Sequence, residues 1–178
     1  MTREQVLRRR IKLLTWVFIV GLLISGATTI PLLSEVNCLV QLAGADKLLQ
    51  NGTSDASPAW AIWLVKVQRG LRDVNATYPF LFYGTDWLAF GHFVIAVAFI
   101  GALRDPIRNL WLFNFGIIAC GLVIPYALLF GAIRGIPFWW RLIDSSFGIF
   151  GLIPICLCRT WALQVASSTG EPKQGDGA

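Results

Sequence analysis

Residues 110–133 read LWLFNFGIIACGLVIPYALLFGAI and carry no charged side chain. A helix needs about 20 apolar residues to cross the hydrocarbon core of a bilayer, since each residue rises about 1.5 Å. A buried soluble core could absorb one such run, but not several of them in one small chain. The stretch therefore predicts a membrane-spanning helix over residues 110–133.

Three more apolar runs of similar length occur, over residues 11–33, 86–103 and 136–158. The chain is 56% hydrophobic and only 14% charged, whereas soluble domains are about 25% charged. The links at residues 104–109 and 134–135 are short and therefore require antiparallel neighbours. We predict an all-α integral membrane protein, an antiparallel four-helix bundle whose partner is the lipid bilayer.

The long segment over residues 34–85 is expected to be exported, and it contains a further helical pattern. Residues 59–74 read AWAIWLVKVQRGLRDV, with apolar side chains at helical spacing and charged side chains on the other side. Such a helix is too polar to span a bilayer and lies in its interface. We predict an amphipathic interfacial helix here, with four side chains buried: Trp60, Trp63, Leu64 and Val67.

The basic residues predict how the chain is oriented. Loops that face the cytoplasm are rich in Lys and Arg, and residues 1–10 hold a basic cluster just before the first run. With both termini in the cytoplasm, most of the 15 Lys and Arg residues lie on that side. Orientation then explains the net charge of +5, and nucleic acid is not expected as a partner. The polar tail over residues 167–178 is typical of a disordered segment.

Residues 139–148, WWRLIDSSFG, place charged side chains in the fourth apolar run. Arg141, Asp144, Ser145 and Gly148 recur at helical spacing, so they share one face that should point into the bundle. A charge in the bilayer core costs ~3 kcal/mol or more unless it has a partner or water. We therefore expect Arg141 and Asp144 to form an ion pair.

The one histidine of the chain, His92, is expected at the depth of Asp144, because both lie about 10 Å below the outer ends of their helices. Polar side chains thus gather in the outer half of the bundle. An alternative is a purely structural role, in which the ion pair fixes helix packing and His92 bonds a carbonyl group. The predicted outward-facing binding site consists of Arg141, Asp144, His92, Asp86, Arg134 and Tyr83.

The residue types exclude several kinds of chemistry. One histidine cannot supply a bis-histidine haem site, and it leaves a zinc site short of ligands. The four cysteines form no Cys-x-x-Cys pair of the kind that a thiol oxidoreductase uses. Serine-nucleophile and phosphate-loop motifs are missing too. We therefore expect no metal and no cofactor, and we assign no catalytic residue.

Three classes of function remain. The first is a non-enzymatic membrane subunit, or a module that binds or senses a small ligand. The second is a small transporter or channel that acts as a homo-oligomer or with a partner membrane protein, since four helices alone enclose little pathway. The third is a membrane enzyme acting on a lipid or quinone, with His92 and Asp144 as acid and base. The first class is favoured, because the inner half of the fourth run is apolar.

Three strings carry a resemblance to known proteins: YPFLFYGTDWLAFGHF, GALRDPIRNLW and IRGIPFWWRLIDSSFG. They are similar to strings in small, uncharacterised multi-pass membrane proteins of bacteria, and the resemblance covers residues 58–160. It implies a bacterial source, and hence a place in the cytoplasmic membrane. It implies no activity, because that group has no established one.

Overall fold

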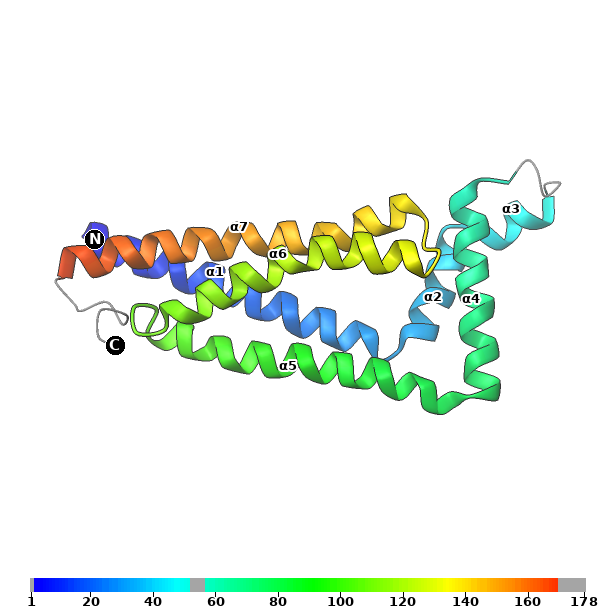
Figure 1. The fold of residues 1–178 in the computed structure, drawn as a ribbon, viewed down its shortest axis with the longest axis horizontal. Helices are drawn as coiled ribbons and strands as arrows, with labels where there is room; N and C mark the ends of the chain where they lie inside the picture. The colour runs from blue at the N-terminus through cyan, green and yellow to red at the C-terminus, as the bar shows by residue number, and fades with distance from the viewer. Residues whose placement is uncertain (1, 52–56, 170–178) are drawn as a thin grey trace. The chain divides into compact units, whose positions relative to one another are not determined.

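The computed structural model describes residues 2–51 and 57–169, and every regular element in these residues is a helix (Figure 1). Four helical segments are long and apolar enough to cross a membrane, and only 17% to 28% of the residues in their apolar windows are buried within the protein. Apolar surface of this extent is typical of contact with lipid. The chain is therefore an all-α, multi-pass integral membrane protein, as the apolar runs predict.

The helices form two compact units, of which unit 1 comprises residues 1–22 and 94–178 and unit 2 comprises residues 23–93. The first helix begins at Arg3, so the basic cluster near the N-terminus lies on helical turns. In chain order the elements are α1 (Arg3–Thr29), α2 (Leu32–Leu42), α3 (Ala45–Asn51), α4 (Ala59–Thr77), η2 (Pro79–Phe82), α5 (Tyr83–Arg104), α6 (Leu110–Ile133) and α7 (Phe138–Thr169).

The core of unit 1 is built around aromatic rings. Phe99 of α5 is fully buried, and its ring centroid lies 4.8 Å from that of Phe18 and 6.5 Å from that of Phe113. Rings that meet at an angle fill the space between helices without voids. The cluster of buried side chains around them consists of Ile11, Ile19, Ala96, Phe99, Ala102, Leu112, Phe113, Ile155, Cys158 and Ala162.

Helices α6 and α7 pack side by side (Figure 1). Gly148 of α7 permits their closest approach, because a Cβ atom there would lie 2.5 Å from the carbonyl oxygen of Cys120. Small residues let membrane helices approach to backbone contact in this way. The link between the two helices turns at Gly135, whose φ of 69° is easily adopted only by glycine.

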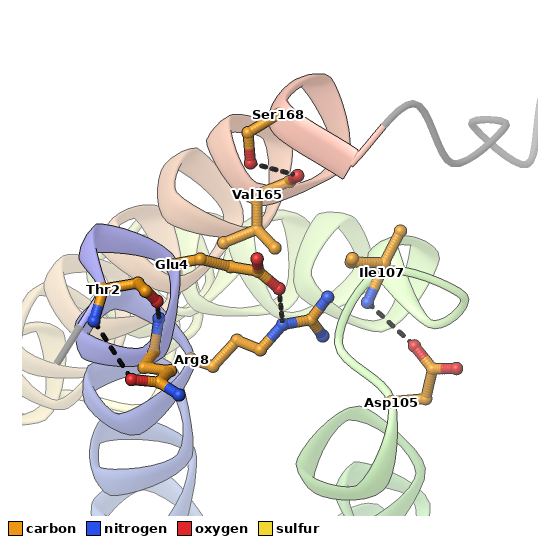
Figure 2. A network of polar contacts seen from close by, with 8 residues as sticks. Thr2, Glu4, Arg8, Asp105, Ile107, Val165 and Ser168 are labelled. Atoms are coloured by element: carbon orange, nitrogen blue, oxygen red, sulfur yellow. Dashed lines mark hydrogen bonds and ion pairs between the residues drawn. The ribbon is translucent and has the colours of Figure 1, made fainter.

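One end of unit 1 brings together the start of α1, the link between α5 and α6, and the end of α7. Leu7 packs there against a buried cluster of Ile107, Val165 and Ala166. Figure 2 shows this end, where the carboxylate of Asp105 accepts a hydrogen bond from the backbone N–H of Ile107 at 3.2 Å. Consecutive helical segments of unit 1 therefore run antiparallel.

Helix α7 is longer than the span predicted over residues 136–158, since it continues without a break to Thr169. The added turns are stabilised by packing, because they bury one face through Ala162 and Val165. The predicted disordered tail over residues 167–178 is therefore helical at its start. The rest of that tail lies outside the described residues.

In unit 2, α4 packs against α2 and α3, two helices that the sequence patterns do not reveal. A polar contact joins α2 to α4. The side-chain amide of Gln68 and the guanidinium group of Arg72 both donate to Oδ1 of Asn37, each at 2.9 Å. The segment over residues 34–85 is thus mostly helical in its described part, and α4 accounts for the predicted helix over residues 59–74.

The face of α4 that packs within the protein is not the face predicted to be buried in the membrane interface. Of the four side chains predicted for that interface, only that of Leu64 is buried within the protein, while Trp60 is 40% exposed and Trp63 and Val67 are half-buried. The prediction followed the most apolar stripe, but close packing with neighbouring helices favours small side chains and an amide with a hydrogen-bond partner. The buried residues of α4 are Ala61, Leu64, Val65 and Gln68.

Candidate functional site

A groove of about 710 Å³ runs along α6 from Ala119 to the end of the helix and reaches the second turn of α7. We call it the α6–α7 groove. Pockets of about 300–1,000 Å³ with apolar walls and a few polar groups are typical of small-molecule sites. The residues from α6 recur at helical spacing and form one continuous stripe. Its lining residues include Ala119, Val123, Tyr126, Ala127, Arg134 and Asp144.

Aromatic and small residues shape the groove. The rings of Tyr126 and Phe130, one helical turn apart, lie 4.4 Å apart between centroids and 33° from parallel. Ala119 and Ala127 lie on the same stripe, and their short side chains leave room above the helix. The stripe ends at Arg134, which is exposed and lies at the mouth of the groove beside the α6–α7 link.

Asp144 is the polar group on the α7 side of the groove. Its side chain is half-buried, and it makes no hydrogen bond or ion pair with any residue in the described part of the chain. A carboxylate at membrane depth requires a partner or water to offset its desolvation. Asp144 can therefore accept hydrogen bonds from a molecule that enters the groove.

In the described part of the chain, Arg141 does not pair with Asp144. The prediction of an ion pair between them is therefore wrong. Its Nη1 donates instead to the backbone oxygen of Leu128 at 3.1 Å, and its Cζ lies 5.3 Å from the centre of the Phe138 ring. Side chains on a helix lean toward its N-terminus, and a long cationic side chain extends toward the membrane surface. Arg141 accordingly leans away from Asp144, which lies almost a turn farther along α7.

The stem of Arg141 rests directly on α6 at a glycine. A Cβ atom at Gly131 would lie 2.6 Å from both Cγ and Cδ of Arg141, so only glycine leaves space for this crossing. The Nε atom of Arg141 is buried without a hydrogen-bond partner. Arg141 thus stabilises the contact between α6 and α7 beside the groove, and it is not among the groove residues.

The other members of the polar stripe on α7 serve helix structure. Ser145 donates from Oγ to the backbone oxygen of Arg141 at 2.8 Å, and Gly148 lies at the close contact with α6. One helical face therefore divides into three environments: an arginine that crosses to α6, an aspartate in the groove, and small residues in the helix interface. Sequence periodicity alone cannot separate these environments.

Two of the predicted site residues, Tyr83 and Asp86, lie together in unit 2. With Trp87 and Phe90 they line a smaller pocket of about 240 Å³ on α5, which we call the α5 pocket. His92 lines neither of these two pockets. Its Nδ1 atom lies 2.8 Å from the backbone oxygen of Leu88, one turn earlier in the same helix, which agrees with the structural alternative for this residue.

The polar residues at the link between α5 and α6 cap helix ends. Asp105 accepts hydrogen bonds from the backbone N–H groups of Ile107 and Arg108, and the amide of Asn109 donates to the backbone oxygen atoms of Gly101 and Asp105. These bonds satisfy backbone groups that helix termini leave free. Within residues 2–51 and 57–169, no group of three His, Cys, Asp or Glu side chains is placed to hold a metal ion.

The chain matches no protein-family model, no curated protein and no solved structure. The resemblance to bacterial multi-pass proteins therefore stays a prediction.

Proposed function

We propose that this protein binds a small amphiphilic molecule in the α6–α7 groove and acts in the membrane as a ligand-binding or sensing module. The observation that supports this most is Asp144, a half-buried carboxylate that lines the groove and has no partner among the described residues. A bound molecule with a hydrogen-bond donor supplies the partner that an intramembrane carboxylate needs.

The groove favours a ligand with three parts. An apolar body lies along the stripe that contains Ala119 and Val123, where a bilayer-dissolved molecule loses no favourable contacts. A donor or cationic group meets Asp144, and an acceptor or anionic group meets Arg134 at the mouth. Hydrogen bonds to charged groups contribute about 1.5–3 kcal/mol each, so these two contacts fix the direction in which the ligand lies.

Native mass spectrometry of the protein in lipid nanodiscs tests this proposal. The wild-type protein is expected to retain a small-molecule adduct. Ala127→Trp fills the groove and should remove it. Leu129→Trp is the matched control, because Leu129 lies on the same helix, is 58% exposed and does not line the groove. Asp144→Asn should raise the Kd for the bound molecule about tenfold, the change that ~1.4 kcal/mol produces, and so lower the occupancy of the groove.

The proposal fails if the wild-type protein carries no adduct, or if Ala127→Trp and Leu129→Trp retain it equally. It also fails if the wild-type protein is a dimer that Ala127→Trp alone dissociates, since the groove would then be a contact between two copies of the chain.

We further propose that the protein resides in a bacterial cytoplasmic membrane with both termini in the cytoplasm. The basic residues support this, because Arg3, Arg8, Arg104 and Arg108 belong to the segments that meet at one end of unit 1. Cytoplasmic segments carry an excess of Lys and Arg. The opposite orientation would export this basic end.

Reporter fusions check the orientation. Green fluorescent protein fused to the C-terminus should fluoresce, because it folds in the cytoplasm. Alkaline phosphatase inserted within residues 52–56 should be active, because it folds only outside. An inactive phosphatase at that position, together with an active phosphatase at the C-terminus, would reverse the assignment.

A further inference from the structure

The α5 pocket combines three aromatic rings with one carboxylate on a single helical face. Tyr83, Asp86, Trp87 and Phe90 recur at the spacing of one face, and they line a space of about 240 Å³. All four side chains are exposed. An isolated aromatic residue near a membrane surface is ordinary, but this pocket adds a negative charge among the rings.

The three rings form an open aromatic cage. The centroids of Tyr83 and Trp87 lie 5.9 Å apart with the ring planes 85° apart, and those of Trp87 and Phe90 lie 5.5 Å apart with the planes 87° apart. Neighbouring rings are thus nearly perpendicular, so their electron-rich faces open in more than one direction. A cation in contact with two such faces is attracted by both quadrupoles.

Elsewhere in the described part of the chain, three aromatic rings lie close to cations of the protein itself. Arg10 lies over the ring of Trp161, and Lys66 lies over that of Trp63, each at 5.8 Å from the ring centre. In the described part of the chain, no Lys or Arg covers the rings of the α5 pocket, and Asp86 makes no ion pair. The pocket therefore has the charge and the ring faces for a cation from outside the chain.

We propose that the α5 pocket binds an alkylammonium group, either a quaternary ammonium or a primary amine. The rings contact the alkyl groups around the nitrogen, and Asp86 neutralises its charge. A membrane offers this chemistry as the choline or ethanolamine part of a phospholipid headgroup, and the aqueous phase offers it as a free amine. This site is independent of the α6–α7 groove, and neither proposal relies on the other.

The test uses 19F NMR of protein labelled with 5-fluorotryptophan in nanodiscs of phosphatidylglycerol, which lacks an amine. The Trp87 resonance is assigned as the one lost in Trp87→Phe. Choline is titrated as the probe, and 3,3-dimethylbutan-1-ol, its neutral isostere, is the matched control. Choline should shift the Trp87 resonance saturably, the isostere should not, and the resonance of Trp111 should stay unchanged.

Two variants examine the parts of the cage. Asp86→Asn is expected to raise the Kd for choline about fivefold, and Phe90→Leu about threefold, as exposed ion pairs and cation–π contacts contribute up to about 1 kcal/mol each. In phosphatidylcholine nanodiscs, a Trp87 resonance that is already at its choline-saturated position identifies the lipid headgroup as the source. A shift that requires added choline in both kinds of nanodisc identifies a free amine.

Equal shifts with choline and its neutral isostere would overturn the proposal, because the pocket would then bind by apolar contact alone. A Trp87 resonance that moves with neither compound nor lipid would overturn it as well. So would an Asp86→Asn variant that binds choline as tightly as the wild-type protein.

Discussion

Phe99→Ala is expected to lower the free energy of unfolding by about 3–5 kcal/mol. Phe99 is fully buried and meets the rings of Phe18 and Phe113, so truncation leaves a cavity between α1, α5 and α6. The loss does not depend on water, since the lining atoms lose their dispersion contacts in a bilayer too. Reversible unfolding in mixed micelles, driven by increasing SDS and followed by circular dichroism, measures the change.

The matched control is Phe150→Ala, which removes the same side chain where it is 71% exposed. We expect it to change the free energy of unfolding by about 0.5 kcal/mol or less. Phe99→Leu retains more of the side-chain volume and should fall between the two. Equal effects of the alanine changes at residues 99 and 150 would contradict the aromatic core of unit 1.

Gly148→Ala is expected to destabilise the protein by about 1–3 kcal/mol, and Gly148→Leu by more, through overpacking. The added Cβ atom would lie 2.5 Å from the carbonyl oxygen of Cys120 and 3.2 Å from the side chain of Val123. A backbone oxygen has no rotamer to move into, so α6 and α7 must separate. The same SDS titration measures the loss.

Gly121 of α6, which follows Cys120 directly in the chain, provides the control, because a Cβ atom there meets nothing within 4 Å. Gly121→Ala should be neutral or should stabilise the helix by up to about 1 kcal/mol, since alanine is the better helix former. If the close contact is present, the two alanine substitutions should change the free energy of unfolding in opposite directions. If Gly148→Ala were also stabilising, that contact would be absent in the membrane.

The helices whose ends are marked by their own residues could be predicted from the sequence. The bounds of α6 agree with the run over residues 110–133, because charged residues flank an uncharged segment. The far end of α7 was not predictable, since its last turns are stabilised by a buried cluster of Ile107, Val165 and Ala166, against which Leu7 packs. Residues so distant in sequence carry no local mark of their contact.

The remaining differences between the predicted and the observed fold arise because side chains contact partners other than the expected ones. The hydropathy pattern of α4 favours its tryptophans as the buried face, but a hydrogen bond from Gln68 to Asn37 identifies the face that packs. Arg141 was expected to meet the nearest opposite charge, Asp144, yet a backbone oxygen of α6 lay within reach. A single sequence shows which groups need partners and does not show which partners they find.

The charged residues of the candidate site could be predicted from the sequence, but the apolar and aromatic residues that line it could not. Arg134, Asp144, Tyr83 and Asp86 stand out because polar groups are rare in apolar runs. Tyr126 and the alanines of the α6–α7 groove resemble any lipid-facing residue, so no local signal marks them. Trp87 and Phe90 did carry a signal, namely their spacing from Tyr83 and Asp86 on one helical face.

The α6–α7 groove lies within one helical hairpin, between residues 119 and 144, joined by the tight turn at Gly135. Contacts between segments so near in sequence form early, because little chain entropy is lost in closing the loop. Natural variation at core positions such as Phe18 and Phe99 should alter how much folded protein accumulates. Variation at the groove positions of the hairpin should alter what the folded protein binds there.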